Sequence, residues 1–259
     1  GLGGWVWEHH KPLLLNNPSE DPRSKGVPEG HIPISRLINV PAMVGKECLG
    51  LIAVANSERD YTDEDLKALM RLAELYALAI QRTQTEDRIK QQTRVLDAIN
   101  RIFQETLRSV TEEDVARVCL KVAEEITGSQ FGFVGEINHE GTYNSIALSD
   151  PGWAECRMSD SNKARMIYGM QIRGYWGKVF TGGTSLIIND PANHPERVGT
   201  PEGHPPISSF LGVPLKKGGK TFGMIALANR PGGYTLKNQQ EVEALSVAFV
   251  EALERKRAD

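Results

Sequence analysis

PEGHPPISSFLGVPL, at residues 201–215, decides the fold because a second stretch of the same chain repeats it. PEGHIPISRLINVPA, at residues 28–42, keeps the Pro-Glu-Gly-His turn and the Val-Pro pair at the same spacing. When residue 1 is placed on residue 174, the match runs without a gap to residues 82 and 255, and about 28 of these 82 positions are identical. A repeat of this length indicates a duplicated domain, since solenoid repeats have periods of about 20–50 residues.

The two copies are unequal in length. Residues 96–173 precede the matching part of the second copy, and the first copy has no counterpart to them. We therefore expect the C-terminal half of one domain over residues 1–82, a helical linker over 83–95 and a complete domain over 96–257. A half-domain exposes a strand edge and an apolar face, so we expect a partner chain or a neighbouring element to cover them.

The complete copy alternates between helical and strand patterns. Thr111 followed by acidic residues predicts a helix start, and Gly128 predicts its end. Apolar alternation around a short turn predicts a β-hairpin at residues 131–149 and a second one at 207–230. Further expected elements are helices at 162–170, 173–183 and 236–255, a strand at 185–190, and a loop with five prolines at 190–206.

This order predicts an α+β fold. The sheet is expected to be antiparallel, with the terminal helices on one face and with loops and short helices on the other. The last helix carries its apolar positions on one stripe, at Val242, Leu245, Phe249 and Leu253, and should pack on the sheet through them.

The element order, with FLGVPL at 210–215, GMIALAN at 223–229 and the terminal helix, resembles a GAF domain. The resemblance covers residues 96–257 in full and 1–82 as a C-terminal half. It implies a small-molecule or chromophore sensor module, common in tandem before histidine kinases and other output domains. The family's ligand pocket lies between the central sheet and its cover, which here is residues 149–206.

Candidate ligand-binding groups lie in or next to this cover. An apolar pocket with a few placed polar groups is the expected site. The candidates are Trp153, Cys156, Tyr168, Arg173, Trp176, His194, His204 and Phe210.

Cys156 and His204 raise a more specific hypothesis. Cys156 follows the turn sequence DPGW and precedes Arg157, whose charge would favour a thiolate. DPGW, this cysteine and PEGHPP resemble haem-binding GAF domains, which implies covalent attachment at Cys156 and His204 as a metal ligand only if haem is bound. The alternatives are an ordinary loop cysteine and a histidine that caps strand ends. A bilin chromophore is disfavoured because Arg157 stands where the family pattern has histidine.

The sequence does not predict an enzyme. It lacks the Walker, HExxH, GxSxG and CxxC patterns, and Asn162-Lys163 lacks the following acid of the cyclic-nucleotide-binding GAF motif. A methionine sulfoxide reductase of this family would need clustered cysteines, which Cys48, Cys119 and Cys156 do not supply.

Residues 63–109 contain no proline or glycine and predict a nearly continuous helix. Its first half is expected to pack on the first copy. Ile89, Leu96 and Phe103, spaced by seven residues, predict a short coiled-coil seam, with Ile99 and Ile102 between them. We therefore expect a homodimer through this helix and the terminal helices. The residues expected to pack on the first copy are Leu66, Leu69, Leu72, Leu75, Tyr76, Ala79 and Ile80.

Charge, hydropathy and cysteine content limit the classes of partner and the cellular location that we expect for the chain. The net charge is −3 and no basic stripe suggests nucleic acid. The apolar runs fall far short of a membrane span, and three irregularly spaced cysteines favour a reducing, cytoplasmic location. No signal peptide is recognisable, although a lost N-terminus would hide one. The first hypothesis is thus a sensory region that binds a ligand or relays a signal to an output domain, which we expect to be a histidine kinase. Haem-based redox or gas sensing and a ligand-free dimerisation and relay module are the alternatives.

Overall fold

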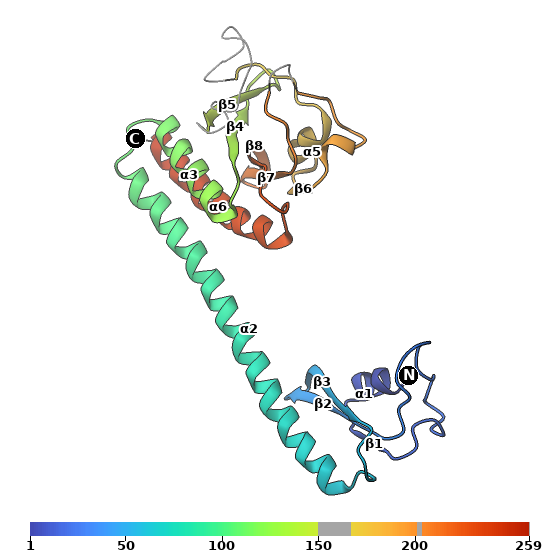
Figure 1. Cartoon of the computed structure of the whole chain (residues 1–259). Coiled ribbons are helices and arrows are strands. Elements are labelled where there is room, and N and C mark those ends of the chain that lie inside the picture. The colour runs from blue at the N-terminus through green and yellow to red at the C-terminus, as the bar shows by residue number, and fades with distance from the viewer. Residues whose placement is uncertain (150–166, 201–203, 259) are drawn as a thin grey trace. The chain divides into compact units, whose positions relative to one another are not determined.

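The computed structural model describes residues 1–149, 167–200 and 204–258, which form two compact units (Figure 1). The first unit comprises Gly1–Gln91 and the second Gln92–Asp259. Helix α2, Asp63–Thr106, contributes its N-terminal part to the first unit and its C-terminal part to the second. Among the residues that the structure describes, no helix is long and apolar enough to cross a bilayer.

The second unit is built on a five-stranded antiparallel sheet in the order β5-β4-β8-β7-β6. Strand β8 is central and pairs with both β4 and β7, so the repeated hairpin forms the middle of the sheet. The predicted α+β fold with an antiparallel sheet is confirmed. The elements are α3 (Glu112–Thr127), β4 (Phe131–Ile137), β5 (Tyr143–Leu148), α5 (Gly174–Gly182), β6 (Leu186–Ile188), the 3₁₀-helix η1 (Pro191–Asn193), β7 (Phe210–Lys217), β8 (Lys220–Ala228) and α6 (Leu236–Ala258).

Helices α3 and α6 cover one face of this sheet (Figure 1). Helix α3 begins where predicted because Thr111 and Asp114 form a capping box, and it ends at Gly128 in the left-handed conformation. The stripe on α6 is confirmed, since Val242, Leu245, Phe249 and Leu253 are all fully buried. They pack with apolar residues of α3 and of β7 and β8 in the larger core.

Helix α5 lies on the opposite face (Figure 1), and strand β6 is the edge strand that pairs with β7. A smaller, aromatic-rich core lies between α5 and the sheet, as the following section describes. The predicted arrangement of terminal helices on one face and short cover elements on the other is therefore confirmed. The short helix expected at 162–170 falls mostly outside the described residues.

The first unit repeats the C-terminal part of the second. Its sheet has the order β1-β2-β3. Its helix α1 is equivalent to α5, and its strands β1, β2 and β3 are equivalent to β6, β7 and β8, with an offset of 173 residues. Backbone details repeat as well, since Asn56 and Asn229 both adopt left-handed conformations. The elements are α1 (Leu2–His9), β1 (Leu13–Leu15), β2 (Leu37–Val44) and β3 (Glu47–Ala55).

Strand β3 is an open edge in the first unit, whereas its equivalent β8 pairs with β4. The exposed fraction of Val54 on β3 is 38%, against 1% for its equivalent Leu227. The N-terminal part of α2 packs on the core of the first unit through Leu66 and Leu69, as expected, and also through the small residues Ala73 and Ala77. The expected packing of Leu72, Leu75 and Tyr76 was wrong, and these side chains are exposed because no equivalent of α3 covers them.

The C-terminal part of α2 joins the core of the second unit. Ile102 is fully buried there and Ile99 packs against the same core, so neither is free to form a coiled-coil seam. Ile89, Leu96 and Phe103 are exposed, as a seam requires. The predicted spacing of seven residues therefore describes a solvent-facing apolar line along α2.

Candidate functional site

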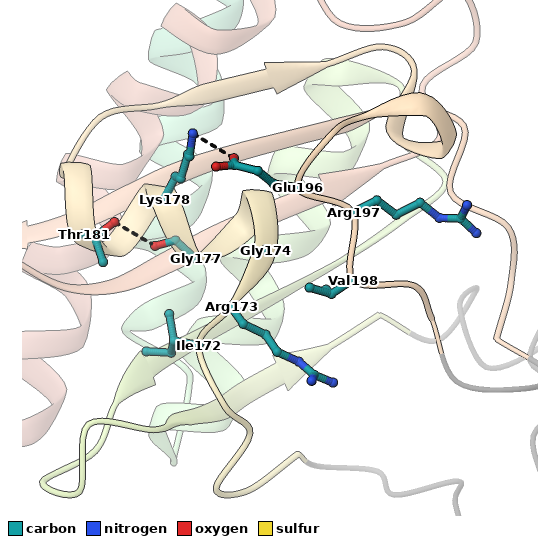
Figure 2. A pocket seen from close by; sticks show the side chains of 9 residues that line it. All are labelled: Ile172, Arg173, Gly174, Gly177, Lys178, Thr181, Glu196, Arg197 and Val198. Carbon is teal, nitrogen blue, oxygen red and sulfur yellow. Dashed lines mark hydrogen bonds and ion pairs between the residues drawn. The ribbon is translucent and has the colours of Figure 1, made fainter.

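An open pocket of about 400 Å³ lies at the N-terminal end of α5, on the cover side of the second unit (Figure 2). One wall is α5 and the residues just before it, and the other is the segment that follows η1. This segment belongs to the proline-rich loop that the sequence marks as a functional candidate. The pocket is lined by Ile172, Arg173, Gly174, Gly177, Lys178, Thr181, Glu196, Arg197 and Val198.

Gly174 allows the two walls to come together. It has a φ of +67°, in the left-handed region, and a Cβ at this position would lie 2.9 Å from the carbonyl oxygen of Glu196 and from Val198. Only glycine satisfies both the backbone conformation and the close approach without strain. Helix α5 starts at this residue, and the preceding Arg173 makes no side-chain cap.

The pocket carries more positive than negative charge. Lys178 and Glu196 form an ion pair across it, with Nζ and Oε2 2.7 Å apart. Within the described residues, Arg173 has no carboxylate partner, and the side chain of Arg197 donates to the carbonyl oxygen of Ala192 at 3.4 Å. Figure 2 shows these two arginines extending from either side of Val198. The adjacent N-terminus of α5 adds to the positive potential, so the arrangement favours an anionic group.

Aromatic residues lie beneath the pocket wall. Tyr175 on α5 makes edge contacts with His194 and Phe210, with ring centroids 5.5 and 5.2 Å away. Burial raises the pKa of Tyr175, and the positive charge of Arg197 opposes this shift. The edge contact between Tyr175 and His194 therefore holds the loop against α5, while Arg197 is exposed.

Tyr143 is the centre of the smaller core. Its ring contacts Phe133, Trp176 and Phe180, at centroid distances of 5.5, 5.7 and 6.1 Å. It also lies over Gly135, where a Cβ would come within 2.3 Å of its hydroxyl oxygen. The hydroxyl is buried and has no hydrogen-bond partner in the part of the chain that the structure describes, and burial raises the pKa of Tyr143 well above its usual value. An unpaired buried hydroxyl costs stability, which marks this position as one that a bound polar group could relieve.

His204 forms a local turn contact. Its Nδ1 lies 2.8 Å from the carbonyl oxygen of Pro205, and His31 repeats this contact with Ile32 at 2.7 Å. Because the first unit has no counterpart of residues 149–173 and still keeps the contact, the turn itself explains the geometry. In the described ranges, no three His, Cys, Asp or Glu side chains gather as a metal site. The hypothesis that His204 would ligate haem therefore stays a prediction.

The structure brings together some of the predicted site residues. Arg173 lines the pocket, His194 and Phe210 meet at Tyr175, and Trp176 lies in the Tyr143 cluster. Tyr168 stands apart, with 70% of its surface exposed. Trp153 and Cys156 lie outside the described residues.

Sequence reasoning missed several residues of the site. Tyr143 on β5 stands between the polar residues Thr142 and Asn144, and this alternation could have assigned it to one face of the sheet. Lys178, Glu196 and Arg197 gave no signal, because no periodic pattern relates a helix surface to an irregular loop.

Comparison with known proteins identifies the family. The family model of the GAF domain matches residues 1–81 and 109–254. The methyl sulfide methyltransferase-associated sensor of Methanosarcina acetivorans is 32% identical over 111 residues, which are 42% of this chain and 11% of that protein. The chain therefore spans about a tenth of the length of this curated relative.

Solved structures agree on the fold. The GAF domain of a phosphoenolpyruvate-protein phosphotransferase from Coxiella burnetii aligns with a TM-score of 0.53 and 17% identity, covering 64% of this chain and 96% of that one. The GAF domain of the corresponding Acinetobacter protein aligns with a TM-score of 0.50 and 17% identity, covering 63% and 94%. At this identity the likeness concerns the fold alone. The matched segments include both units, and the chain belongs to the GAF domain family.

Proposed function

We propose that this chain is a non-catalytic sensory region of a signal-transduction protein and that the pocket at α5 binds a small anionic ligand. GAF domains are sensory and regulatory modules, and a relative of this chain is named as a sensor. The observation that carries the ligand class is the pair of arginines, Arg173 and Arg197, at a pocket where the one carboxylate is already paired with Lys178.

A carboxylate or phosphate suits this pocket physically. Guanidinium groups offer forked N–H donors that match the planar carboxylate and the phosphate oxygens. Two cations and a helix N-terminus within one pocket attract an anion more strongly than either does alone. Binding would hold the loop of Glu196 and Arg197 against α5, because both walls would contact the same ligand.

The output belongs to a larger protein in this proposal. A ligand-dependent shift of the cover would move α2 and α6 and thereby an output domain, which we propose to be a histidine kinase in the cytoplasm. The exposed apolar line of Ile89, Leu96 and Phe103 would pair two copies along α2.

Titration calorimetry with inorganic phosphate and with short mono- and dicarboxylates tests the ligand class. We expect one of these probes to bind, and we expect Arg173→Gln and Arg197→Gln each to weaken its binding by about tenfold or more. Lys237→Gln, on the exposed surface of α6, is the control and should bind as the unmodified chain does. Binding that is equally strong in all three variants would move the site away from this pocket, and no binding of any anion would refute the ligand class.

A further inference from the structure

We propose that Tyr234 couples the pocket wall to helix α2 through a directional chain of hydroxyl hydrogen bonds that ends in the last turn of α3. The inference rests on the proposed sensory function and assigns the route by which the cover acts on the helix. Tyr234 is then a positioning residue, since it lies outside the pocket lining.

The route begins at Asn189, directly after β6. Its Nδ2 donates to the carbonyl oxygen of Tyr234 at 2.9 Å, and the N–H of Tyr234 donates to its Oδ1 at 2.7 Å. A Cβ on Gly233 would lie 2.6 Å from this amide, so glycine is required for the approach. The polypeptide continues from Asn189 through η1 to Glu196 and Arg197, which line the pocket, so the asparagine is close in sequence to the pocket wall.

Three hydroxyls continue the route. The Tyr234 hydroxyl lies 2.7 Å from Ser129 Oγ, which lies 2.6 Å from Thr127 Oγ1. Thr127 Oγ1 donates its single proton to the carbonyl oxygen of Ala123 at 2.6 Å. Each hydroxyl carries one proton, so Ser129 must donate to Thr127 and Tyr234 must donate to Ser129. The order of donors is therefore fixed by the carbonyl at the end of the chain.

The last turn of α3 is also the attachment point of α2. Arg94 on α2 donates from Nη2 to the carbonyl oxygen of Ile126 at 2.7 Å. Arg230 donates from Nε to the next carbonyl, that of Thr127, at 2.9 Å. The terminal carbonyls of a helix have no partner within the helix, so these arginines satisfy groups that the chain of hydroxyls also positions.

Burial makes this chain sensitive to displacement. Tyr234 is 3% exposed, and burial raises the pKa of its hydroxyl above the usual value, so it stays protonated and able to donate. Thr127 is buried as well, whereas Ser129 is half-buried and Asn189 is exposed. A hydrogen bond broken at the buried end of the route leaves its groups unpaired, so displacement of Tyr234 costs free energy there.

The first unit contains the asparagine–tyrosine contact of this route and lacks the hydroxyl groups that continue it. Asn16 and Tyr61 make the same reciprocal contact as Asn189 and Tyr234, at 3.1 and 2.8 Å. Ser129 and Thr127 belong to the part of the domain that has no counterpart in residues 1–82. The asparagine–tyrosine contact is thus common to both copies, and the link to a helix terminus is present only in the complete copy.

A double-mutant cycle followed by amide hydrogen exchange tests the proposal without any ligand. Asn189→Ala loosens the cover contact, and Tyr234→Phe removes only the hydroxyl, because the Asn189 bonds go to its backbone. We expect Asn189→Ala to speed exchange at residues 94–106 by at least about fivefold, and to have less than half that effect when Tyr234→Phe is already present. Asn16→Ala and Tyr61→Phe are the matched controls and should leave residues 94–106 unchanged.

If the effects of Asn189→Ala and Tyr234→Phe simply add, or if Asn189→Ala leaves α2 unchanged, the coupling is refuted. Asn189→Asp, which keeps the acceptor oxygen and removes the donor, replaces the alanine variant if that variant does not fold. A failed anion titration would refute the proposed ligand class and leave the outcome of this cycle intact, so the two proposals fail separately.

Discussion

Leu72 and Leu245 occupy the same position of the repeat, yet Leu72 is 53% exposed and Leu245 is fully buried. The difference follows from α3, which covers Leu245 in the second unit and has no equivalent over Leu72. Comparing these two leucines therefore shows how much burial the covering helix α3 provides.

We expect Leu245→Ala to lower the free energy of unfolding of the second unit by about 2–5 kcal/mol, because it leaves a cavity in the core. Leu72→Ala should change the stability of the first unit by less than about 1 kcal/mol, since its side chain is largely in water already. Amide exchange in β7 and in β2 reports the two units separately. An equally large cost at Leu72 would contradict an exposed face on α2.

This pair also shows what the sequence could predict. Apolar spacing located both hairpins and the helices at 112–127, 174–182 and 236–258, and the repeat predicted that the first unit would resemble the C-terminal part of the second. Spacing assigns a face to Leu72 and Tyr76 and leaves open whether another element covers that face, so their packing was predicted wrongly. The pocket depends on Gly174 meeting an irregular loop at Glu196, a tertiary contact between residues with no shared pattern, and only its Arg173 was anticipated.

Tyr143 and Tyr234 are both buried tyrosines with raised pKa values, and they differ in hydrogen bonding. Tyr143→Phe should leave stability unchanged or raise it slightly, because it removes a hydroxyl without a partner in the described structure. Tyr234→Phe should cost about 0.5–1.5 kcal/mol, since it removes the bond to Ser129. Urea unfolding of the two variants gives the comparison. A larger loss for Tyr143→Phe would indicate that its hydroxyl binds a partner in solution.

Gly174→Ala should impair the pocket. The substitution places a Cβ 2.9 Å from the Glu196 carbonyl oxygen, which pushes the loop with Arg197 away from α5. We expect lower affinity for the anion that binds the unmodified chain, together with a loss of stability. Gly141→Ala is the matched control, because Gly141 has a φ of +76° and open space around its Cβ position. It shares the backbone cost of about 1–2 kcal/mol and should keep full affinity. Equal affinity in both variants would show that the loop position does not matter for binding.

Asp114 gives the α3 capping box a pH dependence. Its hydrogen bonds with Thr111 hold the pKa of its carboxyl below the usual value, and Thr111 N–H donates to it at 2.9 Å. A carboxyl with a lowered pKa in the folded state stabilises above the unfolded pKa of about 4 and loses this contribution as the pH falls through the folded value. Asp114→Asn should therefore reduce the loss of stability of the second unit between pH 5 and pH 2. Urea midpoints across this range, with Asp97→Asn as the control on exposed α2, provide the measurement. Unchanged acid sensitivity in Asp114→Asn would contradict the role of the cap.

Leu96 tests the proposed dimer. It lies between Ile89 and Phe103 on the exposed apolar line of α2, with 59% of its surface in solvent. If two copies pair along this line, Leu96→Glu places two like charges in an apolar seam and should raise the dissociation constant by about tenfold or more. Lys90→Glu, one residue beyond Ile89 and exposed, changes the charge of the same helix outside the line and should leave the dimer intact. Sedimentation equilibrium at tens of micromolar measures both. A chain that is monomeric at these concentrations, or a dimer that Leu96→Glu does not weaken, would remove α2 from the interface and leave the hydroxyl route at Tyr234 to act within a single chain.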